Sequence, residues 1–194
     1  MFLAVLLSSL LVSAQAPNNG CTYSYKPDSL KIEWTAYKFT EKKGVLASFP
    51  VFTLDAPASA NSAQELFEKT SIEIDPQGLE SGDPGRNENL KKYFFKKMIG
   101  PKIKGQIVSF SPAISKVKID MNGVSKVVPF RMKIEGTKYV AETDIDIMDF
   151  KMKKSLEAIN KVCYELHKGA DGKSKTWSAV SLALSTEVIE NCKK

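Results

Sequence analysis

Four consecutive stretches of the chain share the alternation of apolar and polar residues that a half-buried β-strand requires. They span residues 103–110, 114–121, 127–134 and 139–147. The short segments between them contain residue pairs typical of tight turns, namely Ser111-Pro112, Asn122-Gly123 and Gly136-Thr137. Strands joined by such turns run antiparallel to their neighbours. This part of the chain therefore predicts an antiparallel meander.

The same period of two recurs before and after the meander, over residues 30–37, 45–54, 72–74 and 180–188. No parallel crossover pattern is present, and eight antiparallel strands lose their exposed edges if the sheet closes on itself. We therefore expect an all-β fold built on an eight-stranded antiparallel barrel. A barrel of this size is either filled by its own side chains or holds one slender ligand. The residues alone leave both alternatives open.

Two helical patterns interrupt the strands. Between residues 150 and 166, apolar residues recur every three or four positions, which predicts one amphipathic helix of about four turns before the last strand. Ser62 is expected to cap a short helix that runs to Phe67 within a loop.

The N-terminal residues resemble a secretory signal peptide. Residues 3–12 form an apolar run that is too short to span a bilayer, and small residues follow it. No lysine or arginine precedes the run, which departs from the usual pattern. We expect residues 1–16 to be a cleaved leader and residues 17–194 to form one domain that is periplasmic or secreted.

Three cysteines remain after the leader, at Cys21, Cys163 and Cys192. In an oxidising compartment we expect one disulfide and one spare thiol. If the first and last strands are antiparallel neighbours, the start of one lies beside the end of the other, which favours a Cys21–Cys192 bond over Cys163–Cys192. Both pairings stay open. Lipidation of Cys21 also stays open, although the residues before it match a lipoprotein signal poorly.

Catalytic and metal-binding patterns are weak. The chain has a single histidine, His167, and one imidazole cannot form a clustered histidine site for catalytic zinc. Cys163 lies four residues earlier, but a buried helical cysteine more often belongs to a core or a disulfide than to a nucleophile pair. The net charge of +6 comes from dispersed lysines rather than from a nucleic-acid-binding motif. We expect no enzymatic activity, no metal, no cofactor and no nucleic-acid partner.

Residues 86–103 form the most distinctive segment of the chain. Arg86 opens it in a polar turn, and three adjacent aromatic residues follow at Tyr93, Phe94 and Phe95. Lysines flank the aromatic residues, and Gly100-Pro101 ends any helix. Aromatic residues flanked by lysines are typical of a lid or plug segment. They are also typical of a short solvated helix with one buried edge.

The order of several motifs is similar to that of the YceI-like family. They include Arg86, Asn87, Leu90, the Phe94-Phe95 pair and the strand start at Pro101 and Ile103, together with Tyr25, Asp28 and Ser29, residues 44–49, Ile72, Ile74 and Asp75, and residues 122–126. Asn87 stands where the family usually has Asp, Ser29 where it often has His, and Gly105 where an aromatic residue is usual. The resemblance covers nearly the whole mature chain and implies a divergent member with a lipocalin-like barrel.

The resemblance also implies a function, since these proteins hold an isoprenoid or another long-chain amphiphile in an apolar tunnel. The first hypothesis is a periplasmic or secreted carrier of such a lipid, with Phe94 and Phe95 at the mouth. Arg86 and Asn87 would meet the polar head of the ligand or tie the lid to the barrel. The tunnel would be lined by Trp34, Phe49, Phe130, Met132 and Leu182.

The second hypothesis is a non-enzymatic interaction or structural domain with a filled barrel. Its lysine-rich surface, residues 91–104, would dock a partner or a membrane. Transient membrane contact is compatible with both hypotheses, and the resemblance makes a homodimer an open alternative.

Overall fold

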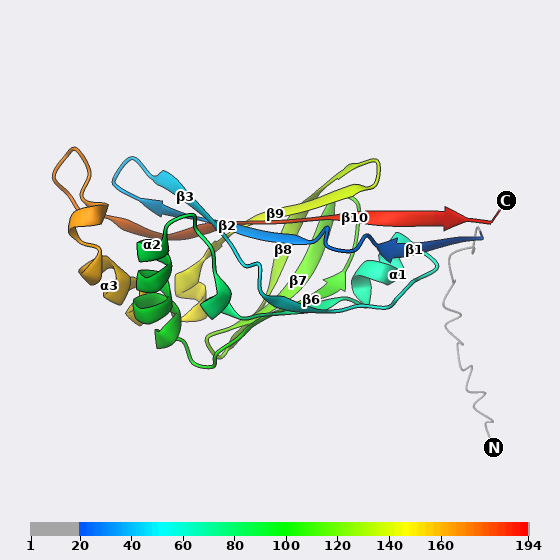
Figure 1. Cartoon of the computed structure of the whole chain (residues 1–194), viewed down its shortest axis with the longest axis horizontal. Coiled ribbons are helices and arrows are strands. Elements are labelled where there is room, and N and C mark those ends of the chain that lie inside the picture. Colours follow the sequence, from blue (N-terminus) through cyan, green and yellow to red (C-terminus); the bar gives the residue numbers. More distant parts are fainter. Residues whose placement is uncertain (1–19, 194) are drawn as a thin grey trace, which may run out of the picture.

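The computed structural model describes residues 20–193, so the predicted leader lies outside the described residues. Its main feature is one strongly curled antiparallel sheet, with short helices at its two ends (Figure 1). This confirms the predicted lipocalin-like, all-β class. The strands are β1 (Cys21–Tyr25), β2 (Lys31–Lys38), β3 (Lys43–Ser48), β4 (Phe52–Asp55), β5 (Ser71–Ile74), β6 (Ile103–Ser109), β7 (Ile114–Met121), β8 (Val124–Glu135), β9 (Lys138–Asp146) and β10 (Thr176–Cys192).

The sheet contains ten strands among the described residues, in the order β3-β2-β10-β9-β8-β7-β6-β5-β4, with β1 paired to β10. The prediction of eight strands was wrong at two places. The run 45–54 is divided into β3 and β4, because the chain leaves the ladder at Phe49 and Pro50 has no N–H to donate. The strand β1 was not predicted.

The prediction that the sheet closes into a barrel was also wrong. The strand order ends at β3 on one side and at β4 on the other, so these two strands are edges that do not pair with each other. The open edge of β3 is partly covered by a loop. Ser48 N donates to Glu80 O at 2.8 Å, and Glu80 N donates to Ser48 O at 3.0 Å. The sheet is therefore a half-barrel whose edge is protected by backbone pairing with a non-strand segment.

The longest strand, β10, organises the molecule. Its first half pairs with β2, from Thr176↔Lys38 to Ser185↔Lys31, and its last residues pair with β1. The strands β1 and β2 thus follow one another along the same edge of β10, while β9 lies on the other edge. In Figure 1, β10 runs the length of the molecule, with the β1 end and the α2 end far apart.

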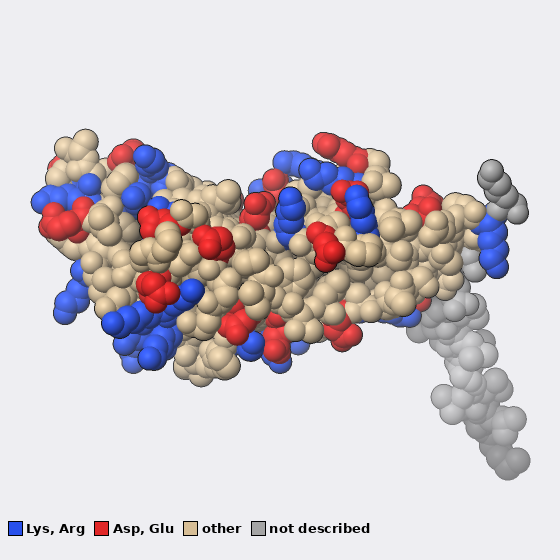
Figure 2. All heavy atoms as spheres, in the orientation of Figure 1, with Lys and Arg blue, Asp and Glu red and all other residues tan. Residues whose placement is uncertain are grey.

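The helices lie at the two ends of the sheet. The short helix α1 (Ala63–Glu68) begins as predicted, with the Ser62 hydroxyl accepting a hydrogen bond from Glu65 N at 3.0 Å. At the other end, α2 (Pro84–Asn89) continues into a π-helical turn (Leu90–Phe94) and a 3₁₀ turn (Phe95–Lys97). We call this continuous segment, residues 84–97, the lid helix. Basic side chains gather over this end of the molecule on the face drawn in Figure 2.

The predicted four-turn helix is shorter than expected. A 3₁₀ turn (Ile147–Phe150) ends at Lys151, whose φ of 56° interrupts the helical hydrogen bonding. The helix α3 (Lys153–Val162) follows, and a separate 3₁₀ turn (Glu165–His167) completes the segment. The apolar residues do recur at the helical spacing. The backbone, however, is interrupted both before and after α3, and a pattern of apolar residues does not reveal such interruptions.

The buried side chains form two clusters. The larger one lies between the curled sheet, the lid helix and α3, and includes Trp34, Phe49, Phe95 and Phe130. The smaller one lies under α1 and contains Ala60, Leu66, Phe67 and Val188. A cavity extends along the sheet between these two clusters and contacts side chains of both.

Candidate functional site

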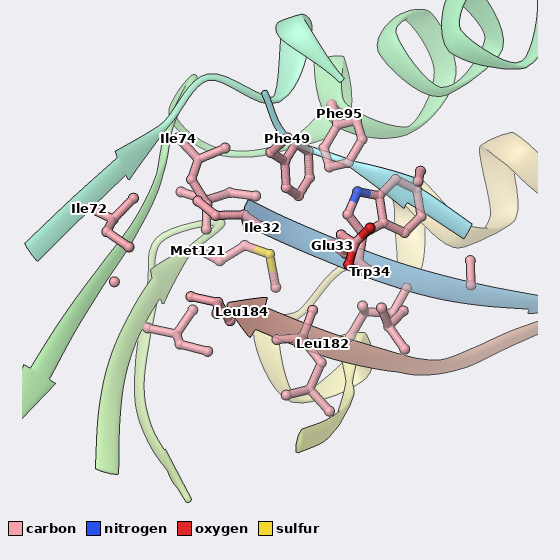
Figure 3. Close-up of a pocket in the computed structure, with 18 of the residues that line it drawn as sticks. Ile32, Glu33, Trp34, Phe49, Ile72, Ile74, Phe95, Met121, Leu182 and Leu184 are labelled. Atoms are coloured by element: carbon pink, nitrogen blue, oxygen red, sulfur yellow. The ribbon is translucent and has the colours of Figure 1, made fainter. Parts of the chain in front are cut away.

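The concave side of the sheet encloses a cavity of about 480 Å³. This volume lies in the range of small-molecule binding sites. Its wall is mostly aliphatic and aromatic, with rings from β2 and the lid helix facing side chains from β7 and β10 (Figure 3). A barrel filled by its own side chains, the alternative prediction, is not what the structure shows.

Strand alternation explains why the wall is apolar. On β2, Ile32, Trp34 and Ala36 point inward and line the cavity. On β10, Val180, Leu182 and Leu184 do the same. Successive side chains of a strand point to opposite faces, so a period-two apolar pattern builds one continuous apolar surface.

Three aromatic rings pack where the lid helix meets the sheet. Trp34 stacks on Phe49 with ring centroids 5.7 Å apart, and Phe95 meets Phe49 and Trp34 edge-on at 5.8 and 6.3 Å. Phe95 belongs to the lid helix and is only 7% exposed. The lid helix therefore inserts a ring into the apolar interior and covers one side of the cavity.

Eight of the nine predicted ligand-binding residues line the cavity, namely Trp34, Phe49, Arg86, Phe94, Phe95, Phe130, Met132 and Leu182. Whether they contact a ligand remains a prediction. Asn87 is the exception. It is buried outside the cavity wall, where its Oδ1 accepts hydrogen bonds from Ser81 N at 3.0 Å and Ser81 Oγ at 2.6 Å. Its amide holds the loop that leads into the lid helix.

Arg86 also makes contacts within the start of the lid. Its Nη1 donates to Ser81 O at 3.0 Å, and its Nη2 lies 3.6 Å from Asp83 Oδ2. Of the two predicted roles, these contacts fit the tying of the lid, while the guanidinium still lines the cavity.

The sequence analysis missed polar residues at both ends of the cavity. Near α1, Tyr25 and Tyr139 line it; near the lid helix, Lys38, His167 and Thr176 do. A signal for Lys38 was available, because it follows Ile32, Trp34 and Ala36 at the inward-facing positions of β2. Tyr25 could not be assigned, because its position depends on β1, which was not predicted. Tyr139 lies on the predicted strand 139–147 but was not recognised as part of the wall.

Gly105 contributes to the volume of the cavity. It lines the cavity, and a Cβ at this position would meet only Val117 Cγ1, at 3.8 Å. The missing side chain therefore leaves space in the wall that a larger residue would occupy.

Tyr25 and His167, at opposite ends of the cavity, both have shifted pKa values. Burial raises the pKa of Tyr25 to about 12, although its hydrogen bond to Thr70 Oγ1, 2.9 Å away, acts in the opposite direction. Burial lowers the pKa of His167, and the nearby Lys38 ammonium lowers it further. Both groups are therefore neutral at pH 7.

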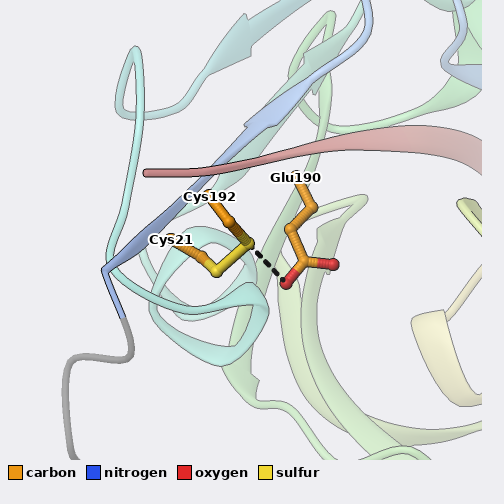
Figure 4. Close-up of side chains that lie close together, drawn as sticks. All are labelled: Cys21, Glu190 and Cys192. Carbon is orange, nitrogen blue, oxygen red and sulfur yellow. Dashed lines mark hydrogen bonds between the residues drawn. A yellow bond between two sulfur atoms is a disulfide. The ribbon is translucent and has the colours of Figure 1, made fainter. Parts of the chain in front are cut away.

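The cysteines do not form a thiol site. A disulfide joins Cys21 to Cys192, the pairing that the strand argument favoured, and this bond excludes lipidation of Cys21. Among residues 20–193, the only cluster with metal-ligand spacing is these two cysteines and Glu190 (Figure 4). Sulfur atoms in a disulfide have no thiolate to offer a metal.

Cys163 is the free cysteine and is buried in the cavity wall. Burial raises the pKa of its thiol, which disfavours the reactive thiolate. The backbone N–H of His167 donates to Cys163 O at 2.9 Å, while the imidazole bonds to Thr176 instead. The arrangement therefore does not activate Cys163 as a nucleophile.

A curled antiparallel sheet with an apolar cavity and a helical lid defines a lipocalin-like class of protein. The chain belongs to the YceI-like family, because the model of the YceI-like domain matches residues 23–186. No curated protein matches the chain. None of the helices among the described residues is long and apolar enough to cross a bilayer.

Solved structures share the fold at low sequence identity. The polyisoprenoid binding domain from Saccharophagus degradans is 13% identical, with a TM-score of 0.59 over 86% of this chain and 98% of that one. BcnA from Burkholderia cenocepacia is 14% identical, with a TM-score of 0.56 over 82% and 96%. The YCEI protein from Campylobacter jejuni is 14% identical, with a TM-score of 0.53 over 81% and 90%.

Proposed function

We propose that the protein is a binding and carrier protein for a long-chain amphiphile, held with its chain inside the cavity. The observation that carries this proposal is the enclosed apolar volume of about 480 Å³ beneath the lid helix. Burial of a hydrocarbon chain stabilises the complex by roughly 25 cal/mol per Å² of apolar area, before the costs of ordering the ligand. One solved structure of the same fold is described as a polyisoprenoid binding domain, which supports a lipid as the ligand.

We further propose that the protein acts in the periplasm or outside the cell, after removal of residues 1–16. The apolar run of residues 3–12 supports export. The Cys21–Cys192 disulfide supports it independently, because disulfides persist in oxidising compartments.

The surface beside the lid helix supports transient contact with an anionic membrane. Ile99, just after the lid helix, is 73% exposed. Lys96 and Lys97 precede it and form no ion pair among the described residues. An exposed apolar side chain next to free ammonium groups suits the boundary between headgroups and acyl chains. Contact here would bring the covered cavity close to the lipid that it takes up.

Two measurements test the carrier proposal. Solvent extraction and native mass spectrometry of the exported protein should reveal a co-purifying lipid, and the delipidated protein should take up a fluorescent fatty acid. Ala141 lines the cavity, so Ala141→Trp should fill it and weaken uptake about tenfold or more.

Ala183→Trp is the matched control, because Ala183 lies on the adjacent strand β10 but outside the cavity wall. It should leave uptake unchanged. The proposal fails if no lipid co-purifies and the wild-type protein takes up no probe.

A further inference from the structure

One end of the cavity is polar although the rest of its wall is apolar. Here the end of β2 meets the lid helix, the 3₁₀ turn after α3 and the start of β10, at the left in Figure 1. The lining side chains at this end are Lys38, Arg86, Asn89, His167 and Thr176, together with the carboxylate of Asp83. They come from four elements, so only the folded chain brings them together.

Lys38 is the unusual member of this group. It occupies the fourth inward-facing position of β2, after Ile32, Trp34 and Ala36, and it is half-buried. It forms no ion pair among the described residues. Its Nζ lies 3.5 Å from Leu166 O, a long hydrogen bond, and 4.7 Å from the centre of the Phe39 ring. An ammonium that makes no ion pair and lies beside an apolar cavity is a suitable partner for an anionic group of a ligand.

The other charges at this end do not neutralise Lys38. Asp83 Oδ1 accepts a hydrogen bond from Arg86 N at 3.0 Å, and its Oδ2 lies 3.6 Å from Arg86 Nη2. The Lys38 ammonium also acts on Asp83, since it contributes, after Arg86, to lowering the pKa of that carboxyl. One carboxylate thus faces two cations, which leaves one positive charge in excess. Glu33, the other acidic residue of the wall, lies between Ile32 and Trp34 and makes no ion pair among the described residues.

The neighbouring polar groups have fixed orientations. Thr176 Oγ1 donates to Asn160 Oδ1 at 2.8 Å and therefore accepts from His167 Nδ1 at 2.7 Å. The neutral imidazole then carries its proton on Nδ1 and leaves Nε2 as an acceptor. This end of the cavity thus combines an ammonium that makes no ion pair among the described residues, an imidazole acceptor and the amide of Asn89, while the long remainder of the cavity is apolar.

We propose that the ligand is an amphiphile with an anionic head, a phosphate or a carboxylate, which binds at Lys38 while the tail extends toward Phe130 and α1. This inference rests on the proposed carrier function and adds the charge of the head and the direction of the ligand. Contact with the polar head of the ligand, which was predicted for Arg86 and Asn87, is assigned mainly to Lys38.

Competition binding with ligands of equal tail length tests the proposal. Geranylgeranyl phosphate, geranylgeraniol, a fatty acid and the matching fatty alcohol each displace a fluorescent lipid from the delipidated protein. We expect at least one anionic member to bind about tenfold more tightly than its alcohol, as a charge-assisted contact allows. The two pairs distinguish a phosphate head from a carboxylate head.

Variants of Lys38 give the matched controls. Lys38→Met keeps the length of the side chain and should abolish the preference for the anion, whereas Lys38→Arg should retain it. Lys31→Met removes an exposed lysine from the same strand and should change nothing. His167 is the single histidine, so its imidazole resonance should shift when the anionic ligand binds, which reports the position of the head independently.

The outcomes separate the two proposals. If the delipidated wild-type protein takes up no fluorescent lipid, the carrier function itself fails. If alcohols and anions bind the wild-type protein equally, the anionic head is overturned while lipid binding stands. If Lys38→Met keeps the preference for the anion, the placement of the head at Lys38 is overturned.

Discussion

Cys21 and Cys192 are directly opposite one another where β1 pairs with the last residues of β10, and a disulfide joins them across 171 positions of sequence. The bond closes nearly the whole described chain into one loop. We expect Cys21→Ser to lower the free energy of unfolding by about 2–5 kcal/mol. Urea denaturation of the oxidised protein measures this. Adding reductant should bring the wild type down to the level of the variant, and equal stability of the two oxidised proteins would contradict the prediction.

Asn122 connects Ile99, just after the lid helix, to the rest of the fold. Its Oδ1 accepts a hydrogen bond from Ile99 N at 2.7 Å, its Nδ2 donates to Phe150 O at 2.8 Å, and its φ is 53°. We expect Asn122→Ala to cost about 2–4 kcal/mol of unfolding free energy, because one buried and one part-buried hydrogen bond are lost and alanine disfavours positive φ.

Asn122→Gly separates these two causes, because glycine tolerates the positive φ while losing the same hydrogen bonds. It should be less destabilised than Asn122→Ala, and both variants should show faster hydrogen exchange at Ile99. Unchanged exchange at Ile99 would mean that Asn122 does not fix the position of the chain just after the lid helix.

Tyr25 should make stability depend on alkaline pH. Burial raises its pKa from 10.0 to about 12 in the folded protein. An unfolded chain loses the phenol proton near pH 10, while the folded protein keeps it. The free energy of unfolding should therefore fall by about 2–3 kcal/mol between pH 10 and pH 12.

Tyr25→Phe is the control for this pH dependence, because phenylalanine has no proton to lose. From about pH 10 to about pH 12, the wild type should lose about 2–3 kcal/mol of unfolding free energy relative to Tyr25→Phe. A difference that stays constant over this range would show that Tyr25 titrates normally.

Trp34 has a buried indole N–H with no acceptor among the described residues. The second indole differs, since Trp177 Nε1 donates to Phe39 O at 2.7 Å. We expect Trp34→Phe to change the unfolding free energy by less than about 1.5 kcal/mol, because no hydrogen bond is lost. Trp34→Ala should cost about 3–5 kcal/mol through lost packing. A Trp34→Phe variant as unstable as Trp34→Ala in urea would contradict this account.

The contact with membranes can be tested by reversing charge at Lys96 and Lys97 together. Each basic residue near an anionic surface contributes about 1 kcal/mol, so the double change to glutamate should weaken vesicle binding more than tenfold. Cosedimentation with phosphatidylglycerol vesicles measures it. The same double reversal at Lys116 and Lys138, two exposed lysines on β7 and β9, is the charge-matched control. Equal losses in both variants would indicate attraction by net charge alone.

Local patterns predicted some elements more reliably than others. The hairpins between β6 and β9 were found because each turn carries glycine or proline and each strand alternates, so neighbouring residues supply all the information. The Ser62 cap was found for the same reason. Strand β1 was missed because its pairing partner, the end of β10, lies at the other end of the chain.

The candidate site was predicted in the same uneven way. Trp34, Phe130 and Leu182 could be placed inside because each lies on the apolar face of a strand. Asn87 was misplaced because its neighbours in sequence do not reveal that its amide turns toward Ser81 and Glu80. Lys38 was overlooked because a lysine near a turn is ordinarily assigned to solvent.

The amino-acid sequence by itself determined the class of the protein, because strand alternation, turn residues and the lid motif act over a few residues at a time. Only the tertiary structure decided that the sheet stays open between β3 and β4 and that Lys38, Asn89 and His167 meet at one end of a cavity. The physical reason is that curvature and volume are properties of many strands packed together, whereas a pattern records the preference of one segment.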